Sequence, residues 1–256
     1  MIDSHAHLYF DRFDEDRDEV VQRAQVAGVE RIINIGIDVA TSGQAIALTG
    51  QYENMAATVG LHPTTPTTDL DADLEQLCSL AEKHRSAVVA VGEIGLDYYW
   101  KDVPPEAQRP KLLAQLKFAR ALDLPVIFHC RDALPDLFEV LESASSLPPG
   151  VFHCFSGDAV SAQRAIALGF HISFAGNVTY RKATDLQDAA RVVPAEKLLL
   201  ETDAPFLAPQ GRRGKRNEPS FLPLTCAFLA DLKQMDPAEL AATAAETTTA
   251  LFQLAG

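Results

Sequence analysis

The sequence predicts an α/β protein, a single (β/α)8 TIM barrel that spans residues 1–256. Short apolar runs rich in Val and Ile recur along the chain, as they do in parallel strands that are buried on both faces. Longer segments with helical periodicity separate these runs, and eight strand–helix units suit a chain of 256 residues. Since no linker or change of composition marks a second domain, we expect one barrel. An open doubly wound sheet is the alternative.

Each predicted element follows from the spacing of its apolar residues. The predicted strands cover residues 2–7, 31–36, 56–61, 87–93, 125–129, 150–153, 170–174 and 197–202. Between them, segments such as 107–123 and 160–168 place apolar residues three and four positions apart, which gives a helix one core-facing stripe. In a barrel, this alternation brings the carboxyl ends of all the strands to one face.

The composition excludes several classes of protein. With 47% hydrophobic and 22% charged residues, the chain is globular rather than disordered or fibrous. The apolar runs are far shorter than the roughly 18 to 20 residues of a membrane span, and no signal peptide is visible. A net charge of −13 argues against a broad basic surface, so a phosphate-bearing substrate needs metal ions or a local basic cluster. Four cysteines without a CxxC pair are typical of reduced thiols in a cytoplasmic protein.

Residues with metal-binding chemistry gather at the predicted strand ends. A histidine inside an apolar run is usually a core residue, but here seven candidates fall at the ends of six strands. They are His5, His7, His62, Glu93, His129, His153 and Asp203. In a barrel these ends form the face on which active sites are built. The set therefore predicts a metal site at the C-terminal face of the strands.

The pair His5 and His7 carries the most weight. Residues i and i+2 of a strand share a face, so both imidazoles can hold one ion. Glu93 ends an otherwise apolar strand, where a carboxylate is costly unless it is paired or binds a metal. We expect it to bridge two cations, as in two-metal hydrolases. Pairing with a loop arginine is the alternative.

The remaining ligands complete two coordination shells. We expect His129 and His153 to complete the shell of the second ion, and Asp203 to hold the first ion and accept a proton from the attacking water. Glu201 shares a strand face with Asp203 and is expected to point inward. The four predicted histidine ligands favour zinc or manganese over magnesium alone, although the availability of metals in the cell can override that preference.

Substrate contacts are expected around the metals. His62 is assigned to substrate contact or proton delivery, with loop capping as the alternative. A basic loop after Asp203 is placed where barrels often bind phosphate, although such a loop can also be merely solvated. Tyr98, Tyr99 and Trp100 form an aromatic patch that can either stack on bases or roof the barrel. The candidate substrate-binding residues are His62, Arg131, Glu201, Arg212, Arg213, Lys215, Arg216 and Asn217.

The motifs together resemble those of the TatD family of metal-dependent deoxyribonucleases. They are Ser4-His-Ala-His7, Gly60-Leu-His-Pro63, Gly92-Glu-Ile-Gly-Leu-Asp-Tyr98, His153-Cys-Phe-Ser-Gly157, Glu201-Thr-Asp-Ala-Pro205 and Arg216-Asn-Glu-Pro219. The resemblance implies a two-metal barrel that hydrolyses DNA, typically from the 3′ end. It also implies that the metal ligands are the same six residues: His5, His7, Glu93, His129, His153 and Asp203. Ala6 departs from relatives, which often carry cysteine there.

These observations predict a cytoplasmic metal-dependent hydrolase that cleaves phosphodiester bonds. The expected activity is that of a DNase, a 3′–5′ exonuclease on single-stranded DNA, with Glu93, Asp203 and His62 as catalytic residues. An amidohydrolase-type enzyme that acts on a small amide, lactone or phosphoester is the first alternative, and a non-enzymatic metal-dependent binding protein is the second. DNA is the expected partner, no membrane is involved, and a monomer is expected.

Overall fold

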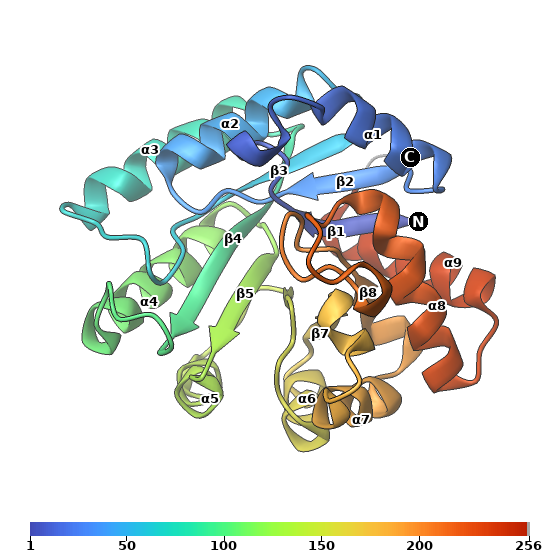
Figure 1. Cartoon of the computed structure of the whole chain (residues 1–256). Coiled ribbons are helices and arrows are strands. Elements are labelled where there is room, and N and C mark those ends of the chain that lie inside the picture. Colours follow the sequence, from blue (N-terminus) through green and yellow to red (C-terminus); the bar gives the residue numbers. More distant parts are fainter. Residues whose placement is uncertain (255–256) are drawn as a thin grey trace. The chain divides into compact units, whose positions relative to one another are not determined.

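The computed structural model describes residues 1–254, in which strands and helices alternate along the chain (Figure 1). The strands are β1 (Ile2–Ala6), β2 (Arg31–Asn34), β3 (Met55–Val59), β4 (Val88–Asp97), β5 (Val126–Arg131), β6 (Gly150–Phe152), β7 (His171–Phe174) and β8 (Leu198–Leu200). The helices are α1 (Arg17–Val26), α2 (Val39–Thr49), α3 (Leu70–Lys83), α4 (Pro105–Ala121), α5 (Leu134–Ser143), α6 (Ala159–Ala167), α7 (Thr184–Val192), α8 (Leu222–Lys233) and α9 (Pro237–Phe252). Each predicted strand is present.

The strand order identifies the fold class. The eight strands are neighbours in chain order, from β1 to β8. The chain just after β8 returns to β1, because Ala204 forms a parallel bridge with Ala6 and Asp203 N donates to His5 O at 2.9 Å. An open doubly wound sheet has two unpaired edges and another strand order. The prediction of a (β/α)8 fold is therefore confirmed.

The chain folds as two compact units. The first comprises Met1–Asn34 and the part of the chain from His153 onward, and the second comprises Ile35–Phe152. In the first unit α8 and α9 pack together beside β8, and in the second α4 packs on β4 (Figure 1). A single domain over residues 1–256 stays a prediction.

In the first unit, a buried carboxylate fastens the start of the chain to the segment after β8. Asp3 is fully buried and accepts hydrogen bonds from Thr202 N at 2.9 Å and from Thr202 Oγ1 at 2.6 Å. Burial raises the pKa of Asp3 to about 7, although these hydrogen bonds oppose the shift. Because His5 follows Asp3 on β1 and Asp203 follows Thr202, this contact places two predicted ligands side by side.

In the second unit, β4 is longer than predicted and continues past Glu93 to Asp97. Its pairing with β5 shifts register between Val91 and Ile94. Gly95 has a φ of +145°, and a Cβ there would lie 1.9 Å from His129 O, so only glycine fits. The longer strand brings Asp97 level with Arg131 at the end of β5.

A buried polar face of α4 supports the ends of β3 and β4. Gln115 exchanges two hydrogen bonds with the backbone of Leu61, at 2.7 and 3.0 Å. Gln108 does the same with the backbone of Asp97, at 2.7 Å each. Lys111 Nζ donates to His62 O, and burial lowers the pKa of this lysine to about 8. The backbone that carries predicted site residues is thus held from behind by one helix.

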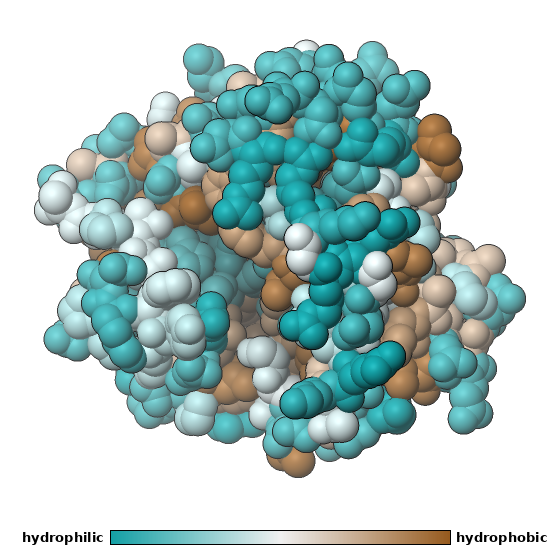
Figure 2. Space-filling view, in the orientation of Figure 1, coloured by the Kyte–Doolittle hydropathy of each residue, from teal (hydrophilic) through white to brown (hydrophobic). Residues whose placement is uncertain are grey.

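The surface is mostly hydrophilic, as the composition predicts. Hydrophilic residues cover most of the face drawn in Figure 2, and the hydrophobic residues on it are scattered. Within residues 1–254, no helix is both long enough and apolar enough to cross a membrane. No disulfide joins the four cysteines.

Candidate functional site

The first unit gathers His5, His7 and Asp203 around one point. The two Nε2 atoms lie 3.3 Å apart, and Asp203 Oδ1 lies 3.7 Å from His5 Nε2 and 3.5 Å from His7 Nε2. Ligands at about 2.0–2.1 Å from a tetrahedral zinc ion are separated from each other by about 3.3 Å. The three donor atoms therefore already have the spacing that a bound divalent ion requires. We call these residues the first-unit ligand group.

The backbone fixes the carboxylate of this group. Asp203 has a φ of 55°, in the left-handed region that residues other than glycine rarely adopt. Asp203 O accepts a hydrogen bond from Phe206 N at 2.8 Å, and Asn217 Nδ2 donates to Thr202 O at 2.8 Å. Such a conformation persists only where the surroundings over-determine it, and it concentrates at functional sites. The aspartate is thus held before any ion binds.

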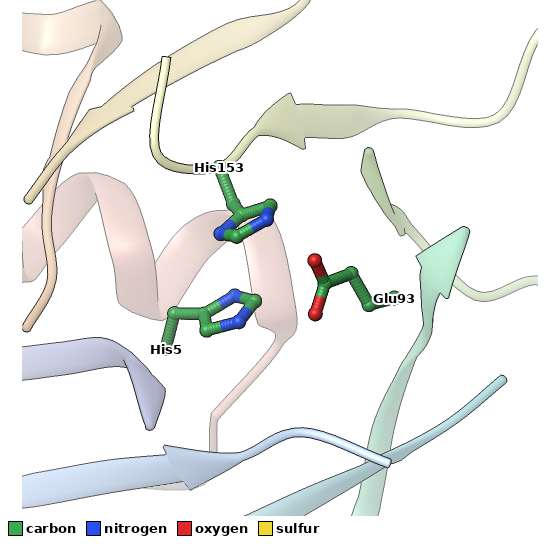
Figure 3. Close-up of side chains that lie close together, drawn as sticks. All are labelled: His5, Glu93 and His153. Atoms are coloured by element: carbon green, nitrogen blue, oxygen red, sulfur yellow. The ribbon is translucent and has the colours of Figure 1, made fainter. Parts of the chain in front are cut away.

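His153 follows β6 and lies against the same group. Its ring stacks on that of His5, with centroids 3.9 Å apart and planes inclined by 9° (Figure 3). Glu201 is fully buried behind it: Oε1 lies 3.5 Å from His153 Nδ1 and accepts a hydrogen bond from Cys154 N at 2.6 Å. Within residues 1–254, Glu201 Oε2 has no hydrogen-bond partner. As predicted, Glu201 points inward, and it contacts His153 from the protein interior.

The second unit joins two carboxylates through one histidine. His129 Nδ1 lies 2.7 Å from Glu93 Oε1, and His129 Nε2 lies 2.8 Å from Asp97 Oδ2. A neutral imidazole can donate to only one of these carboxylates, whereas a protonated ring donates to both. Burial by itself would raise the pKa of Asp97, but the hydrogen bonds from His129 and from the amides of Trp100 and Tyr99 lower it. Glu93, Asp97 and His129 form the second-unit ligand group.

Asp97 was not among the predicted site residues. The strand was expected to end at Glu93, and that boundary placed Asp97 in a loop. A carboxylate four positions after Glu93 shares its strand face if the strand continues, and this spacing was the available signal. The register shift beside Gly95 could not be read from the apolar pattern.

His62 lies beside the second-unit ligand group. Its Nε2 is 3.6 Å from Glu93 Oε1, and its ring centroid is 4.4 Å from that of His129. His62, Asp97 and His129 each offer a ligand atom, and these atoms lie within 4.8 Å of one another. Thr64 N donates to His62 Nδ1 at 3.2 Å, which leaves the proton of a neutral ring on Nε2. The contact with Thr64 caps the loop, and it also turns the Nε2–H group of a neutral His62 towards Glu93.

The basic loop after β8 divides into buried and exposed parts. Arg216 makes two hydrogen bonds of 2.7 Å to the carboxylate of Asp16, which lower the pKa of Asp16 to about 2. Asn217 is fully buried and shapes the loop backbone. In contrast, Arg212, Arg213 and Lys215 are exposed. These three side chains are the accessible cations of the loop.

The three aromatic residues after β4 also differ in their contacts and exposure. Tyr98 Oη donates to Asp136 Oδ2 at 2.8 Å, whereas the rings of Tyr99 and Trp100 are exposed. The guanidinium of Arg131 lies over Tyr99, with Cζ 3.6 Å from the ring centroid. Arg131 is the last residue of β5, lies two residues after His129 and is exposed.

The sequence matches a known protein family over almost its whole length. The family model described as TatD related DNase matches residues 2–253. A protein of Bacillus subtilis named metal-dependent hydrolase YabD is 36% identical over 255 residues, which cover 99% of each chain. The 3′-5′ ssDNA/RNA exonuclease TatD of Shigella flexneri is 38% identical over 261 residues, which cover both chains fully.

Solved structures extend the likeness to the fold. The crystal structure of YjjV, a TatD homolog from Escherichia coli K12, matches with a TM-score of 0.93 and 36% identity, and the match covers 100% of this chain and 98% of the other. A dihydroorotase matches with a TM-score of 0.67 at 15% identity, which is a likeness of fold alone.

Proposed function

The chain belongs to the TatD family of metal-dependent hydrolases, and from that premise we propose that it is a 3′–5′ exonuclease that hydrolyses phosphodiester bonds of single-stranded DNA. A relative that is named a single-stranded DNA and RNA exonuclease, and is 38% identical over the full length, supports this assignment. RNA is a second possible polymer for the same site.

The observation that carries the proposal is the spacing of the first-unit ligand group. Donor atoms of His5, His7 and Asp203 that are 3.3–3.7 Å apart fit one divalent ion. We propose that a second ion is held by His129 and His153, with Glu93 shared between the two. Zinc, manganese and magnesium are the candidates. When bound, the ions would activate water and offset the charge that develops on the phosphoryl oxygens.

The chain's own residues would perform the remaining steps. The carboxylate of Asp203, fixed by its backbone, would accept the proton of the attacking water. His62 would contact the substrate or deliver a proton from Nε2 to the leaving oxygen. Buried Glu201 would keep the ring of His153 in place.

The accessible cations would hold the polymer. Arg212, Arg213 and Lys215 are exposed on the loop after β8, and Arg131 is exposed after β5. Guanidinium groups bind phosphate with paired hydrogen bonds. They supply the local positive charge that a chain of net charge −13 needs in order to bind a polyanion.

The test is cleavage of single-stranded DNA labelled at the 3′ or the 5′ end, with Mg²⁺ or Mn²⁺. We expect a ladder that shortens from the 3′ end, is abolished by EDTA and is absent with Glu93→Ala. The exposed Glu139→Ala serves as the matched control and should cleave normally. If the metal-loaded protein cleaves no phosphodiester but hydrolyses a small amide or lactone, the proposal is wrong.

We further propose that the protein acts in the cytoplasm as a monomer. Four cysteines that form no disulfide suit a reducing compartment. The large apolar side chains that are exposed within residues 1–254 are scattered over several elements, from Val26 to Leu224. Light scattering should give a mass near 27.8 kDa, and a mass twice as large would contradict the monomer.

A further inference from the structure

Three side chains at the ends of β4 and β5 form an exposed surface of aromatic and cationic groups. Tyr99 is 50% exposed and Trp100 is 52% exposed. Their rings meet edge to face, with centroids 5.1 Å apart. Arg131 Cζ lies 3.6 Å from the centroid of Tyr99 and 5.9 Å from that of Trp100. We call these three residues the stacking platform.

The stacking platform is fastened to the second-unit ligand group by one carboxylate. Asp97 Oδ1 accepts hydrogen bonds from Tyr99 N at 2.9 Å and from Trp100 N at 3.0 Å. Its other oxygen, Oδ2, lies 2.8 Å from His129 Nε2. The turn that carries the two rings is therefore fixed relative to His129.

The rings are not explained by packing. Tyr98, in the same turn, has its hydroxyl bound to Asp136, whereas Tyr99 and Trp100 leave half of their surface in solvent. Adjacent exposed apolar side chains that are rimmed by polar groups are typical of a ligand-binding surface. A cation held against them attracts a polyanion in a chain of net charge −13. Aromatic faces beside an arginine are the arrangement that binds unpaired bases.

We propose that the stacking platform binds an unpaired nucleobase of the substrate strand, with Arg131 contacting the adjacent phosphate. The proposal rests on the proposed function, and it restricts the substrate to single strands because bases in a duplex are stacked on each other. The base is one that lies near the scissile bond, since Asp97 ties the platform to His129.

The protein carries its own probe of this contact, because Trp100 is its only tryptophan. The wild-type protein in Mg²⁺ is titrated with phosphorothioate oligothymidylate, which resists hydrolysis. Stacking of thymine on Trp100 should produce a saturable loss of indole emission. The matched ligand is an abasic phosphorothioate strand of the same length, which should leave the emission unchanged. Equal quenching by both strands would overturn the proposal.

Kinetics give an independent readout. Trp100→Ala should raise KM on single-stranded DNA about tenfold, with little change in kcat. Hydrolysis of bis(p-nitrophenyl) phosphate, which has no nucleobase, should be unaffected. Trp100→Phe retains an aromatic face and should restore most of the affinity. Leu224→Ala removes another exposed apolar side chain, on α8, and is the control that should change nothing.

The failure of this inference can be distinguished from the failure of the proposed function. If wild type cleaves single-stranded DNA and Trp100→Ala has the same KM, the platform does not bind a base. If wild type cleaves no phosphodiester, the proposed function is wrong. In that case thymine-specific quenching would still support the platform, and its absence would overturn it.

Discussion

The two ligand groups differ in the spacing of their donor atoms. In the first-unit ligand group, Nε2 of His5 and of His7 and Oδ1 of Asp203 stand 3.3–3.7 Å apart, close to the separation of about 3.3 Å between the ligands of a tetrahedral zinc ion. In the second-unit ligand group, His129 is in direct hydrogen bonds of 2.7 and 2.8 Å with Glu93 and Asp97. The first group already has the donor spacing that an ion requires, whereas the second is held together by two short hydrogen bonds.

The difference in donor spacing should affect how readily each group binds a metal ion. An ion that binds the first-unit ligand group needs little rearrangement. An ion that binds Glu93 and His129 must break the hydrogen bond between them and displace the proton that they share. The two ligand groups should therefore differ in metal affinity and in proton release.

The largest effect is expected from Asp203→Asn. The amide keeps the shape of the carboxylate but accepts no proton and binds cations weakly, so kcat should fall by about 10² to 10⁴-fold. The melting temperature should change little, because the backbone around Asp203 is held by its neighbours. Asp188→Asn, an exposed aspartate on α7, is the control. An active Asp203→Asn protein would remove this residue from the mechanism.

Calorimetric titration with Mn²⁺ tests the difference between the groups directly. We expect two binding steps, of which the second is weaker and has an enthalpy that depends on the ionisation enthalpy of the buffer, because it releases a proton. Glu93→Gln should lose the second step and keep the first, and His7→Ala should lose the first. Two identical steps in the wild type would contradict the comparison.

The next effect concerns stability. Asp97→Asn removes the charge that holds His129 and the amides of Tyr99 and Trp100, which should lower the free energy of unfolding by about 1–3 kcal/mol at pH 7. Because the folded-state pKa of Asp97 is lowered, this stabilisation is present above the ordinary aspartate pKa of about 3.9 and is lost as the pH falls through the folded value. Urea unfolding should show that the difference in free energy of unfolding between wild type and variant becomes smaller in acid. A difference that grows in acid would contradict a stabilising role of the Asp97 carboxylate.

The smallest effect is expected at Arg216. Its partly exposed pair with Asp16 should contribute no more than about 1 kcal/mol to stability, and Arg216→Ala should leave KM unchanged. Arg213→Ala, in the same loop but with its guanidinium exposed over Tyr180, should raise KM, most strongly at low salt. If Arg216→Ala raises KM as much as Arg213→Ala, then Arg216 binds the substrate despite its ion pair.

Much of the site was predictable because side chains two positions apart in a strand lie on the same face. His5 and His7 share a strand face, and their approach to Asp203 follows from the return of the last strand to the first. His153 directly follows β6 and His129 lies two residues before the end of β5, as the predicted strands require, whereas Glu93 lies four residues before the end of β4. The apolar pattern determines the strands, and the strands determine which polar residues meet.

The parts that were not predictable depend on contacts between distant residues. Arg216 lies in a basic loop by sequence, yet its guanidinium is committed to Asp16, 200 positions away. Asp97 joins the site only because β4 continues beyond Glu93, past a glycine that fits against His129 O. Neither the partner of a charge nor a register shift is encoded in local periodicity.

The proposed function requires that one carboxylate, Glu93, is shared by two bound ions. Electron paramagnetic resonance of the protein loaded with two equivalents of Mn²⁺ tests it without reference to any substrate. Two ions bridged by a carboxylate lie about 3.5–4 Å apart and should give an exchange-coupled spectrum. Glu93→Gln should give only the six-line signal of an isolated ion. A wild-type protein that binds two Mn²⁺ ions and shows no coupling would contradict the account.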